Sequence, residues 1–541
     1  MLEGYCKDPR ISLEVLSRRI FEGFCSHVLR LKLPWNFPKL LKNSLGIFRN
    51  DFKTPLEFSE ITQKVAWNFP KSCIICTVKY MMEKDLELKR HIDRWLLEWK
   101  NNPNHKPALI KGIRQSGKTH SIQQFLYDKK NYDIVIELNF WDKPELIDVF
   151  DGPLDIDSII RELSVKIPFP DLIDGRTVFF FDEVQDCPRA LLSLKTNMND
   201  KRYDFIASGS YLGVNGYVIG DATPKPVGSV DEFDMRTMDF EEFLWAKGYQ
   251  EEQVRYIEEA FHKKMPLSNS MHQAFTKLFR EYLCIGGFPE AVKNYVLTNN
   301  IYSSLQITRK ISKDLQGDFG RRRGRDRKPV FNTNEVARIR SAFSLIPSFL
   351  GKENKRYIVS KIEGKGAKDA SKDALDYLKD TGLILKVHNL DIPSTPLAVN
   401  VIQNQFKVFA TDIGMLVSML EDGATDAILS GNLGMGKGMI YEGLVADALY
   451  KRGGAIFYFA KDSGLELDFV VNINGDATIL EVKAVDGNAK SAKTVMKHPD
   501  HYGKTKIIHI KESNVGYSNE ELTIPHYMAF LLFTWSPTLP I

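Results

Sequence analysis

The sequence is poor in cysteine, in net charge and in long apolar runs. Six cysteines among 541 residues are too few for a disulfide framework and suit a reducing cytosol, so we expect a cytoplasmic protein. No apolar run approaches the roughly 20 residues of a membrane helix, so we expect no membrane partner. The net charge of +4, from 73 basic and 69 acidic residues, is too small to indicate nucleic-acid binding unless a local patch carries it.

Residues 1–80 differ from the rest of the chain. They hold four of the six cysteines and show no clear helical or strand period. Cys73 and Cys76 have CxxC spacing, but no second pair follows that would complete a zinc site. A helical pattern begins only after Met81 and Met82. We therefore interpret 1–80 as an atypical N-terminal extension and hypothesise that the native protein starts at one of these two methionines.

The spacing of apolar residues changes along the rest of the chain and indicates separate regions. Apolar strands alternate with helical patterns at first, which predicts a parallel α/β sheet. The expected strands are 108–112, 132–138, 177–183 and 203–209. The expected regions are an ATPase-like α/β domain at 83–245, a helical region at 246–350, a compact module at 351–420 and a final α/β domain at 430–541.

The stretch GIRQSGKT, residues 112–119, matches the GxxxxGK[ST] phosphate-binding loop. It lies between an apolar strand and a helix-compatible segment, as such a loop requires. Its glycines let backbone N–H groups surround phosphates, and the N-terminus of the next helix adds positive charge. Lys118 would neutralise the β- and γ-phosphates, and the Thr119 hydroxyl would hold Mg²⁺. The expected ATP contacts are Gly112, Ile113, Arg114, Gln115, Ser116, Gly117, Lys118, Thr119 and His120.

An acidic pair supports the same activity. Asp182 and Glu183 follow four apolar residues, which is typical of a strand buried on both faces. Ligands bind at the carboxyl ends of such strands, so Asp182 is expected to hold Mg²⁺ and Glu183 to act as general base. A simple helix N-cap is the alternative for this pair. Ser208 or Ser210, at the end of the following strand, would contact the γ-phosphate or merely form a tight turn.

A β-hairpin is predicted at 466–484. Asn474 and Gly475 form one of the strongest two-residue hairpin signals, because a type I′ turn needs positive φ at both positions. With these two residues as the loop, Ile473 pairs with Asp476. Every further pair then follows from the same register.

This register places Asp468 opposite Glu481, with Lys483 on the same face. Carboxylates in direct opposition are destabilising unless a cation lies between them, and Mg²⁺ or Mn²⁺ suits carboxylate oxygens. Lys483 would then stabilise developing phosphate charge. Contacts of Lys483 with Glu466 and Asp468 are the alternative, because they would neutralise the face without a metal.

Several stretches resemble a prokaryotic group of AAA-type P-loop ATPases with a C-terminal nuclease-like domain of unknown function. The likeness covers about 83–535. The stretches are GIRQSGKT (112–119), FFFDEVQ (179–185), FIASGSYLG (205–213), PVGSVDEFDMRTMDFEEFL (226–244), YLCIGGFPEAV (282–292), ENKRYIVSKI (353–362), FKVFATDIGML (406–416) and MIYEGLVADAL (439–449). DFEEFL and GGFPE are what point to this group, because the P-loop and FFFDE are common to many nucleotide hydrolases.

The resemblance implies ATP binding and hydrolysis with Mg²⁺, a cytoplasmic location and a prokaryotic origin. Asp468, Glu481 and Lys483 resemble the core of PD-(D/E)xK nucleases, and Glu442 resembles the additional acid on the first helix of that fold. Ser229 departs from the group, in which a basic residue often follows the glycine. No arginine finger is identifiable, and Arg114 is expected to face solvent or a neighbouring carboxylate.

Two segments are candidate contacts for DNA. Residues 351–390 resemble a winged helix, whose second helix can enter the major groove. Its lysines would supply positive charge: Lys361, Lys365, Lys368 and Lys372. Many winged helices contact only protein, and that alternative stays open. The run 321–328 holds six basic residues and one acid, which predicts either a phosphate contact or a solvated linker.

The predicted fold is therefore an α/β protein with three parts. These are a P-loop AAA-type parallel sheet with a helical lid, a winged-helix-like middle module, and a C-terminal α/β domain with a PD-(D/E)xK-like core. The predicted function is ATP hydrolysis coupled to a nuclease-like domain acting on DNA, with a homo-oligomer as a candidate assembly. The alternative is an ATP-dependent switch whose nuclease-like domain is catalytically silent.

Overall fold

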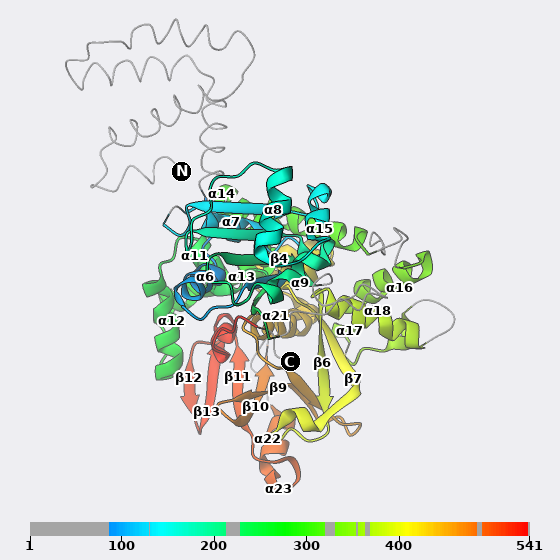
Figure 1. The fold of residues 1–541 in the computed structure, drawn as a ribbon. Helices are drawn as coiled ribbons and strands as arrows, with labels where there is room; N and C mark the ends of the chain where they lie inside the picture. The colour runs from blue at the N-terminus through cyan, green and yellow to red at the C-terminus, as the bar shows by residue number, and fades with distance from the viewer. Residues whose placement is uncertain are drawn as a thin grey trace, which may run out of the picture. The chain divides into compact units, whose positions relative to one another are not determined.

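The computed structural model describes residues 86–538, except for residue 129 and the segments 212–227, 320–330, 353–354, 363–367 and 484–488. The expected N-terminal extension, the two candidate starting methionines and the basic run at 321–328 lie outside the described residues. Residues Glu87–Ile541 form one compact unit, drawn in colour in Figure 1. Among the described residues, no helix has the length and apolar character needed to cross a bilayer.

A five-stranded parallel sheet forms the first part of this unit. Its strands are β1 (Ala108–Gly112), β2 (Ile134–Asn139), β3 (Thr177–Asp182), β4 (Asp204–Ser210) and β5 (Asp231–Met235). Its helices are α6 (His91–Asn101), α7 (Lys118–Leu126), α8 (Ile156–Lys166) and α9 (Pro188–Thr196). The strand order is β2-β3-β4-β1-β5, so β4 separates the P-loop strand from the strand that carries the acidic pair.

Strand β3 is buried on both faces, as its apolar run predicts. Phe179 and Phe181 belong to the apolar core on one face of the sheet. Val178 and Phe180 belong to the core on the other face. The four residues contribute to two separate cores because successive side chains of a strand point to opposite faces. The acidic end of β3 is thereby anchored in the middle of the domain.

A helical region follows, as expected for 246–350. Its helices are α11 (Phe240–Ala246), α12 (Glu251–Lys263), α13 (Asn269–Ile285), α14 (Pro289–Thr298), α15 (Ile301–Gly317), α16 (Thr333–Ser344) and α17 (Ile346–Leu350). The DFEEFL stretch begins α11 with a reciprocal cap. Asp239 accepts from the Glu242 N–H, and Glu242 accepts from the Asp239 N–H. Such a cap satisfies two backbone donors at a helix start.

A mixed eight-stranded sheet forms the rest of the unit. Its order is β12-β13-β11-β10-β9-β8-β6-β7. The strands are β6 (Ile384–Leu390), β7 (Val401–Ala410), β8 (Phe457–Ala460), β9 (Glu466–Ile473), β10 (Asp476–Val482), β11 (Lys506–Lys511), β12 (Gly516–Ser518) and β13 (Glu521–Pro525). The helices are α18 (Lys368–Asp380), α19 (Ile413–Ser418), α20 (Gly423–Ser430), α21 (Lys437–Lys451), α22 (Lys490–Lys497) and α23 (Pro499–Tyr502).

The middle module and the C-terminal region share this sheet. Strands β6 and β7 form an antiparallel pair after α18, and β6 also pairs in parallel with β8. The pair that would be the wing of a winged helix is thus continuous with the strands of 430–541 (Figure 1). The alternation of residues within each segment did not indicate this pairing, because it carries no information about which strands become neighbours.

The predicted hairpin register is confirmed. Asn474 and Gly475 have φ values of 54° and 89°, and Ile473 pairs with Asp476. The same register continues to the pair of Phe469 with Leu480. Continued by one position, this register would set Asp468 opposite Glu481.

Gly287, in the GGFPE stretch, lies against the backbone of Met238. A Cβ atom at this position would overlap the Met238 carbonyl group. The two residues also share a hydrogen bond of 2.7 Å from the Met238 N–H to the Gly287 carbonyl. The approach brings the start of α14 to the residues that precede α11, so glycine is needed here for space.

We predict that Gly287→Ala lowers protein stability. Overpacking at a site with only backbone neighbours costs about 1–3 kcal/mol, and calorimetry should show a lower unfolding midpoint. Gly438→Ala is the matched control, because a Cβ there meets open space within α21. Its midpoint should stay equal or rise, since alanine favours helix. A Gly287→Ala protein as stable as the wild type would contradict the close approach.

Candidate functional site

The P-loop has the backbone shape that its sequence predicts. Gly117 caps α7 in the left-handed region with φ 92°, and Gln115 is also left-handed at φ 63°. Gly112 ends β1 beside β5, where a Cβ would overlap the Met235 carbonyl. The Ser116 hydroxyl donates to the Ile113 carbonyl at 2.9 Å. These contacts hold the loop in a turn at the N-terminus of α7.

The Lys118 ammonium is buried and bonded to the loop itself. It donates to the carbonyls of Gly112 at 3.2 Å and Ile113 at 2.8 Å. Burial lowers its pKa to about 8, although the nearby Glu183 and Asp182 act in the opposite direction. An anion such as a phosphate would stabilise this ammonium better than two neutral carbonyls do.

The carboxylate of Asp182 lies where three strand ends meet. Thr119 Oγ1 is 3.1 Å from both of its oxygens. Asn139 donates to it at 3.0 Å from the end of β2, and the Ser208 hydroxyl donates to it from β4. Burial raises its pKa, opposed by the Ser208 and Thr119 hydrogen bonds. A buried carboxylate beside a threonine hydroxyl is a donor set that fits Mg²⁺.

A cavity of about 930 Å³ opens in front of these groups. Seven residues expected at the site line it: Arg114, Gln115, Gly117, Lys118, Thr119, His120 and Glu183. Five others expected there are not among its lining residues: Gly112, Ile113, Ser116, Asp182 and Ser208. Ser210 lines it, so the structure separates the two candidate serines. Ser208 bonds to Asp182, and Ser210 faces the cavity.

Helix α15 and the residue that follows it supply cavity residues that sequence reasoning missed. Lys313, Asp314 and Asp318 line the cavity, and Arg114 forms an ion pair of 2.5 Å with Asp318. The expectation that Arg114 faces solvent or a carboxylate is thus met. Trp141, 71% exposed, lines the cavity as well. No sequence motif marks these residues, because they reach the P-loop only through the fold.

Gln185 is a second contact that the sequence did not indicate. Its side-chain Nε2 donates to Glu183 Oε2, and its side-chain Oε1 accepts from the Ser210 N–H at 3.2 Å. Glu183 itself lies in the left-handed region with φ 52°, directly before a short 3₁₀ turn at Val184–Asp186. The amide therefore fixes the position of the Glu183 carboxylate at the cavity wall.

The second candidate site gathers acidic residues of the C-terminal region. Burial and the charge of Asp468 raise the pKa of Glu481 and of Glu442. The three carboxylates therefore lie within electrostatic reach of one another, on β9, β10 and α21. Asp468 accepts from the Val482 N–H at 2.9 Å, which fixes its orientation across the hairpin. Lys483 lies 2.7 Å from Glu481.

Two lysines that sequence reasoning missed also enter this site. Lys355 pairs with Glu442, and the buried Lys407 lies 4.0 Å from Glu442 and 2.7 Å from Glu466. Glu466 thus pairs with Lys407 on β7, and not with Lys483 as the alternative interpretation supposed. Lys407 could not be placed from the sequence, because it arrives from another strand of the shared sheet.

The acidic site has the chemistry to take a divalent cation. Glu442 Oε2 and Glu481 Oε2 are buried and have no hydrogen-bond partner among the described residues. Buried carboxylate oxygens without a hydrogen bond are costly, and a cation would lower that cost. Four carboxylates, including Glu466, face three lysines, so the formal charge of the cluster is −1 when all of these groups are ionised.

Comparisons with known proteins agree with the first site. Residues 104–244 match a family model described as an AAA domain. The chain contains an AAA-type P-loop ATPase domain. Residues 276–426 and 437–527 match two families described only as domains of unknown function, DUF8612 and DUF4143. No curated protein matches the chain.

Three of the solved structures that match the chain are distant from it in sequence. The ORC2 protein of Aeropyrum pernix, in ADPNP–ADP complexes, is 12% identical, covers 64% of this chain and 92% of its own, and has a TM-score of 0.25. The ADP form of the same protein is 13% identical, and the match covers 64% of this chain and 95% of that one, with a TM-score of 0.24. A signal transduction ATPase with a tetratricopeptide repeat sensor from Pyrococcus horikoshii is 11% identical. The match covers 67% of this chain and 48% of that one, with a TM-score of 0.21. At such TM-scores the likeness carries no weight for function.

The lowered pKa of Lys118 predicts proton uptake when a nucleotide binds. A phosphate favours the charged ammonium, so the pKa rises on binding. Above pH of about 8 the free protein has lost this proton, so binding must take one up and affinity must fall. Calorimetry in buffers of different ionisation enthalpy would measure this uptake. The control is neutral pH, where Lys118 is already protonated. Equal proton uptake at neutral and alkaline pH would contradict the assignment.

Proposed function

We propose that this protein is a Mg²⁺-dependent ATPase coupled to a C-terminal nuclease-like domain that acts on DNA. The observation that carries the ATPase part is the buried Lys118 ammonium, which lines a cavity of about 930 Å³. Thr119 and Asp182 lie beside it as a donor set for Mg²⁺. The match of 104–244 to an AAA domain supports this part.

Each group at the first site has a proposed task. Lys118 and the N-terminus of α7 would neutralise the β- and γ-phosphates. Thr119 and Asp182 would hold Mg²⁺, which supplies further charge neutralisation when bound. Glu183 would take the proton of the attacking water as general base. Gln185, bonded to Glu183, would position that carboxylate.

The nuclease-like part is proposed for Glu442, Asp468, Glu481 and Lys483. Glu442 Oε2 and Glu481 Oε2, which accept no hydrogen bond from the described residues, support a divalent cation there, and such a cation polarises a phosphodiester. Lys483 would stabilise negative charge on the reacting phosphate. Of the lysines expected to contact DNA, Lys361 and Lys372 are exposed.

A silent regulatory domain is the second candidate. The observation that favours it is the pairing of Lys355 and Lys407 with acids of the same site. Although burial opposes it, Glu442 and Glu466 raise the pKa of Lys407, so this lysine stays charged. Lysines in these places neutralise carboxylates that a metal would otherwise hold. The protein would then be an ATP-dependent switch, with a homo-oligomer as a candidate assembly.

We predict that Lys118→Ala abolishes ATP binding and turnover. Glu183→Gln should retain binding but slow hydrolysis by about 10²–10⁴-fold, the usual contribution of a general base. Phosphate release and binding of a fluorescent ATP analogue measure the two effects. Glu162→Gln, on the exposed face of α8, is the control and should match the wild type. ATP turnover that survives Lys118→Ala would refute the ATPase assignment.

We predict that Mn²⁺ binds the acidic site and that Glu481→Gln removes this binding. Burial and Asp468 raise the pKa of Glu481 above the usual pKa of glutamate. Protonation of Glu481 should therefore weaken Mn²⁺ binding at a higher pH than an ordinary glutamate would. Paramagnetic resonance of free Mn²⁺, without nucleotide, measures the affinity. Asp476→Asn is the control, because Asp476 lies on the same hairpin and pairs with the exposed Lys506.

Cleavage of single- and double-stranded DNA with Mn²⁺ then separates the two candidates. Cleavage that disappears in Lys483→Ala supports the nuclease. Mn²⁺ binding without cleavage supports the silent domain, and unchanged cleavage by Lys483→Ala would exclude this site as the source.

A further inference from the structure

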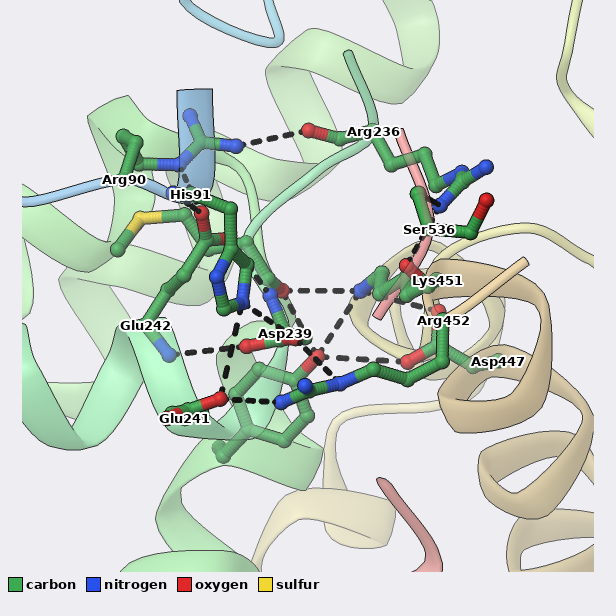
Figure 2. Close-up of polar contacts among 12 residues, drawn as sticks. Arg90, His91, Arg236, Asp239, Glu241, Glu242, Asp447, Lys451, Arg452 and Ser536 are labelled. Carbon is green, nitrogen blue, oxygen red and sulfur yellow. Dashed lines mark hydrogen bonds and ion pairs between the residues drawn. The ribbon is translucent and has the colours of Figure 1, made fainter. Parts of the chain in front are cut away.

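Four stretches that carry the family resemblance meet in one buried ionic cluster. Asp239 belongs to DFEEFL, Gly287 to GGFPE, Asp412 to FATDIGML, and Asp447 to MIYEGLVADAL, whose helix ends at Lys451. They are far apart in the sequence, yet hydrogen bonds and ion pairs bring them together. Figure 2 shows Asp239, Asp447, Lys451 and Arg452 of this cluster. None of them takes part in either site proposed above.

The first half of the cluster is centred on Asp412. Its Oδ2 accepts from Thr237 Oγ1 at 2.7 Å, from the Gly287 N–H at 2.9 Å and from Lys451 Nζ at 3.0 Å. Lys451 also donates to Tyr282 at 2.9 Å and lies 3.0 Å from Asp447. Lys451 is buried, so its charge is balanced only within the protein.

The second half is centred on Asp239 and Arg452. Arg452 Nε and His91 Nε2 each lie 3.0 Å from Asp239 Oδ2, and Arg452 Nη2 lies 2.5 Å from Glu241 (Figure 2). His91, Asp239 and Glu241 bring their ligand atoms within 4.8 Å of one another. The Arg452 guanidinium already neutralises Asp239 and Glu241, so we do not assign a metal site to these three residues.

Arg90 joins this cluster to the P-loop. Its Nη1 donates to the Ser116 carbonyl at 2.9 Å, inside the phosphate-binding loop. Its Nη2 donates to the Arg236 carbonyl at 2.8 Å, and its Nε donates to Glu242 at 3.0 Å. Glu242 is bonded in turn to Asp239 through their shared helix cap. A continuous set of buried polar contacts thus runs from Ser116 to Arg452.

Helix α21 carries the connection to the acidic site. Lys451 and Arg452 stand at its C-terminal end, and Glu442 lies in its first half. Both places belong to one uninterrupted helix, which rises about 1.5 Å per residue. It packs against β7, α19 and β10, and β7 and β10 carry Lys407 and Glu481 of the acidic site.

We propose that this buried cluster couples nucleotide binding at the P-loop to the position of α21, and through α21 to Glu442. The inference rests on the proposed nucleotide binding at Lys118, and it adds the route and the residues that link the two sites. Arg90 and Arg452 are positioning residues in this account. Because coupling is reciprocal, a cation at Glu442 changes nucleotide affinity by the same factor.

Hydrogen exchange of the full chain tests the coupling. Exchange is measured with Mg²⁺ alone and with Mg²⁺ plus ADPNP, in peptides that cover 112–126 and 437–451. In the wild type, ADPNP should slow exchange in both peptides, by about 5-fold or more in 437–451. Arg452→Gln should keep the slowing at 112–126 and lose it at 437–451.

Two further variants complete the design. Arg90→Lys keeps the charge but cannot reach three acceptors at once, so it should also lose the response of 437–451. Arg94→Gln is the matched control, since Arg94 is exposed on the same helix as His91 and pairs only with Glu98 among the ion pairs of the described residues. It should behave as the wild type.

The outcomes separate this inference from the proposed function. Slowing at 112–126 without any at 437–451 in the wild type overturns the coupling and leaves ATP binding standing. Retention of both responses in Arg452→Gln overturns the route. Absence of any change at 112–126 overturns nucleotide binding and the coupling with it. If Arg452→Gln does not fold, the wild-type comparison still decides the coupling, and Arg90→Lys decides the route.

Discussion

The arrangement of this protein depends on the mutual neutralisation of buried charges around Asp239 and Asp412. Arg452 and His91 lower the pKa of Asp239 even though burial opposes them, so it is ionised in the folded protein. Lys451 lies against Asp412 in the same way. An unpaired charge in such a place costs several kcal/mol, so the cations and acids must be brought in together. The contribution of Asp239 to stability is therefore present above the usual pKa of aspartate and is lost as the pH falls below it.

This constraint explains why the helices around the cluster have one arrangement within the unit Glu87–Ile541. Helices α11, α13, α19 and α21 each contribute a residue or a carbonyl to the cluster. Apolar contacts alone would tolerate several rotations of these helices. Directional hydrogen bonds in a medium of low polarity tolerate few. The same contacts reach the P-loop through Arg90, so the shape of the nucleotide site and the position of α21 are set by one group of residues.

Local features of the fold and sites could be predicted from the sequence. The run before Asp182 predicted a strand buried on both faces, because burial on both faces leaves no alternation. Asn474 and Gly475 predicted the hairpin register, because few residues adopt positive φ. The P-loop could be recognised from its glycines and Lys118. In each case a short stretch of chain carries its own physical constraint.

Features that depend on distant strands and helices could not be predicted. Lys407 faces Glu442 only because β7 belongs to the same sheet as β9 and β10. Lys313 reaches the cavity only because α15 packs beside the P-loop. The cluster at Asp239 draws on residues from 90 to 452, and no periodicity marks buried ion pairs. The stretches DFEEFL and GGFPE indicated a family, but their physical role appears only when the partners are placed.

A double-mutant cycle on Asp239 and Arg452 tests the central claim most directly. The unfolding free energies of Asp239→Asn, Arg452→Met and the double variant are compared with that of the wild type. Each single change should cost about 3–5 kcal/mol, because it leaves the other charge buried and unpaired. The double change should cost much less than the sum of the two. Additive costs, or single variants as stable as the wild type, would show that this pair does not hold the structure together.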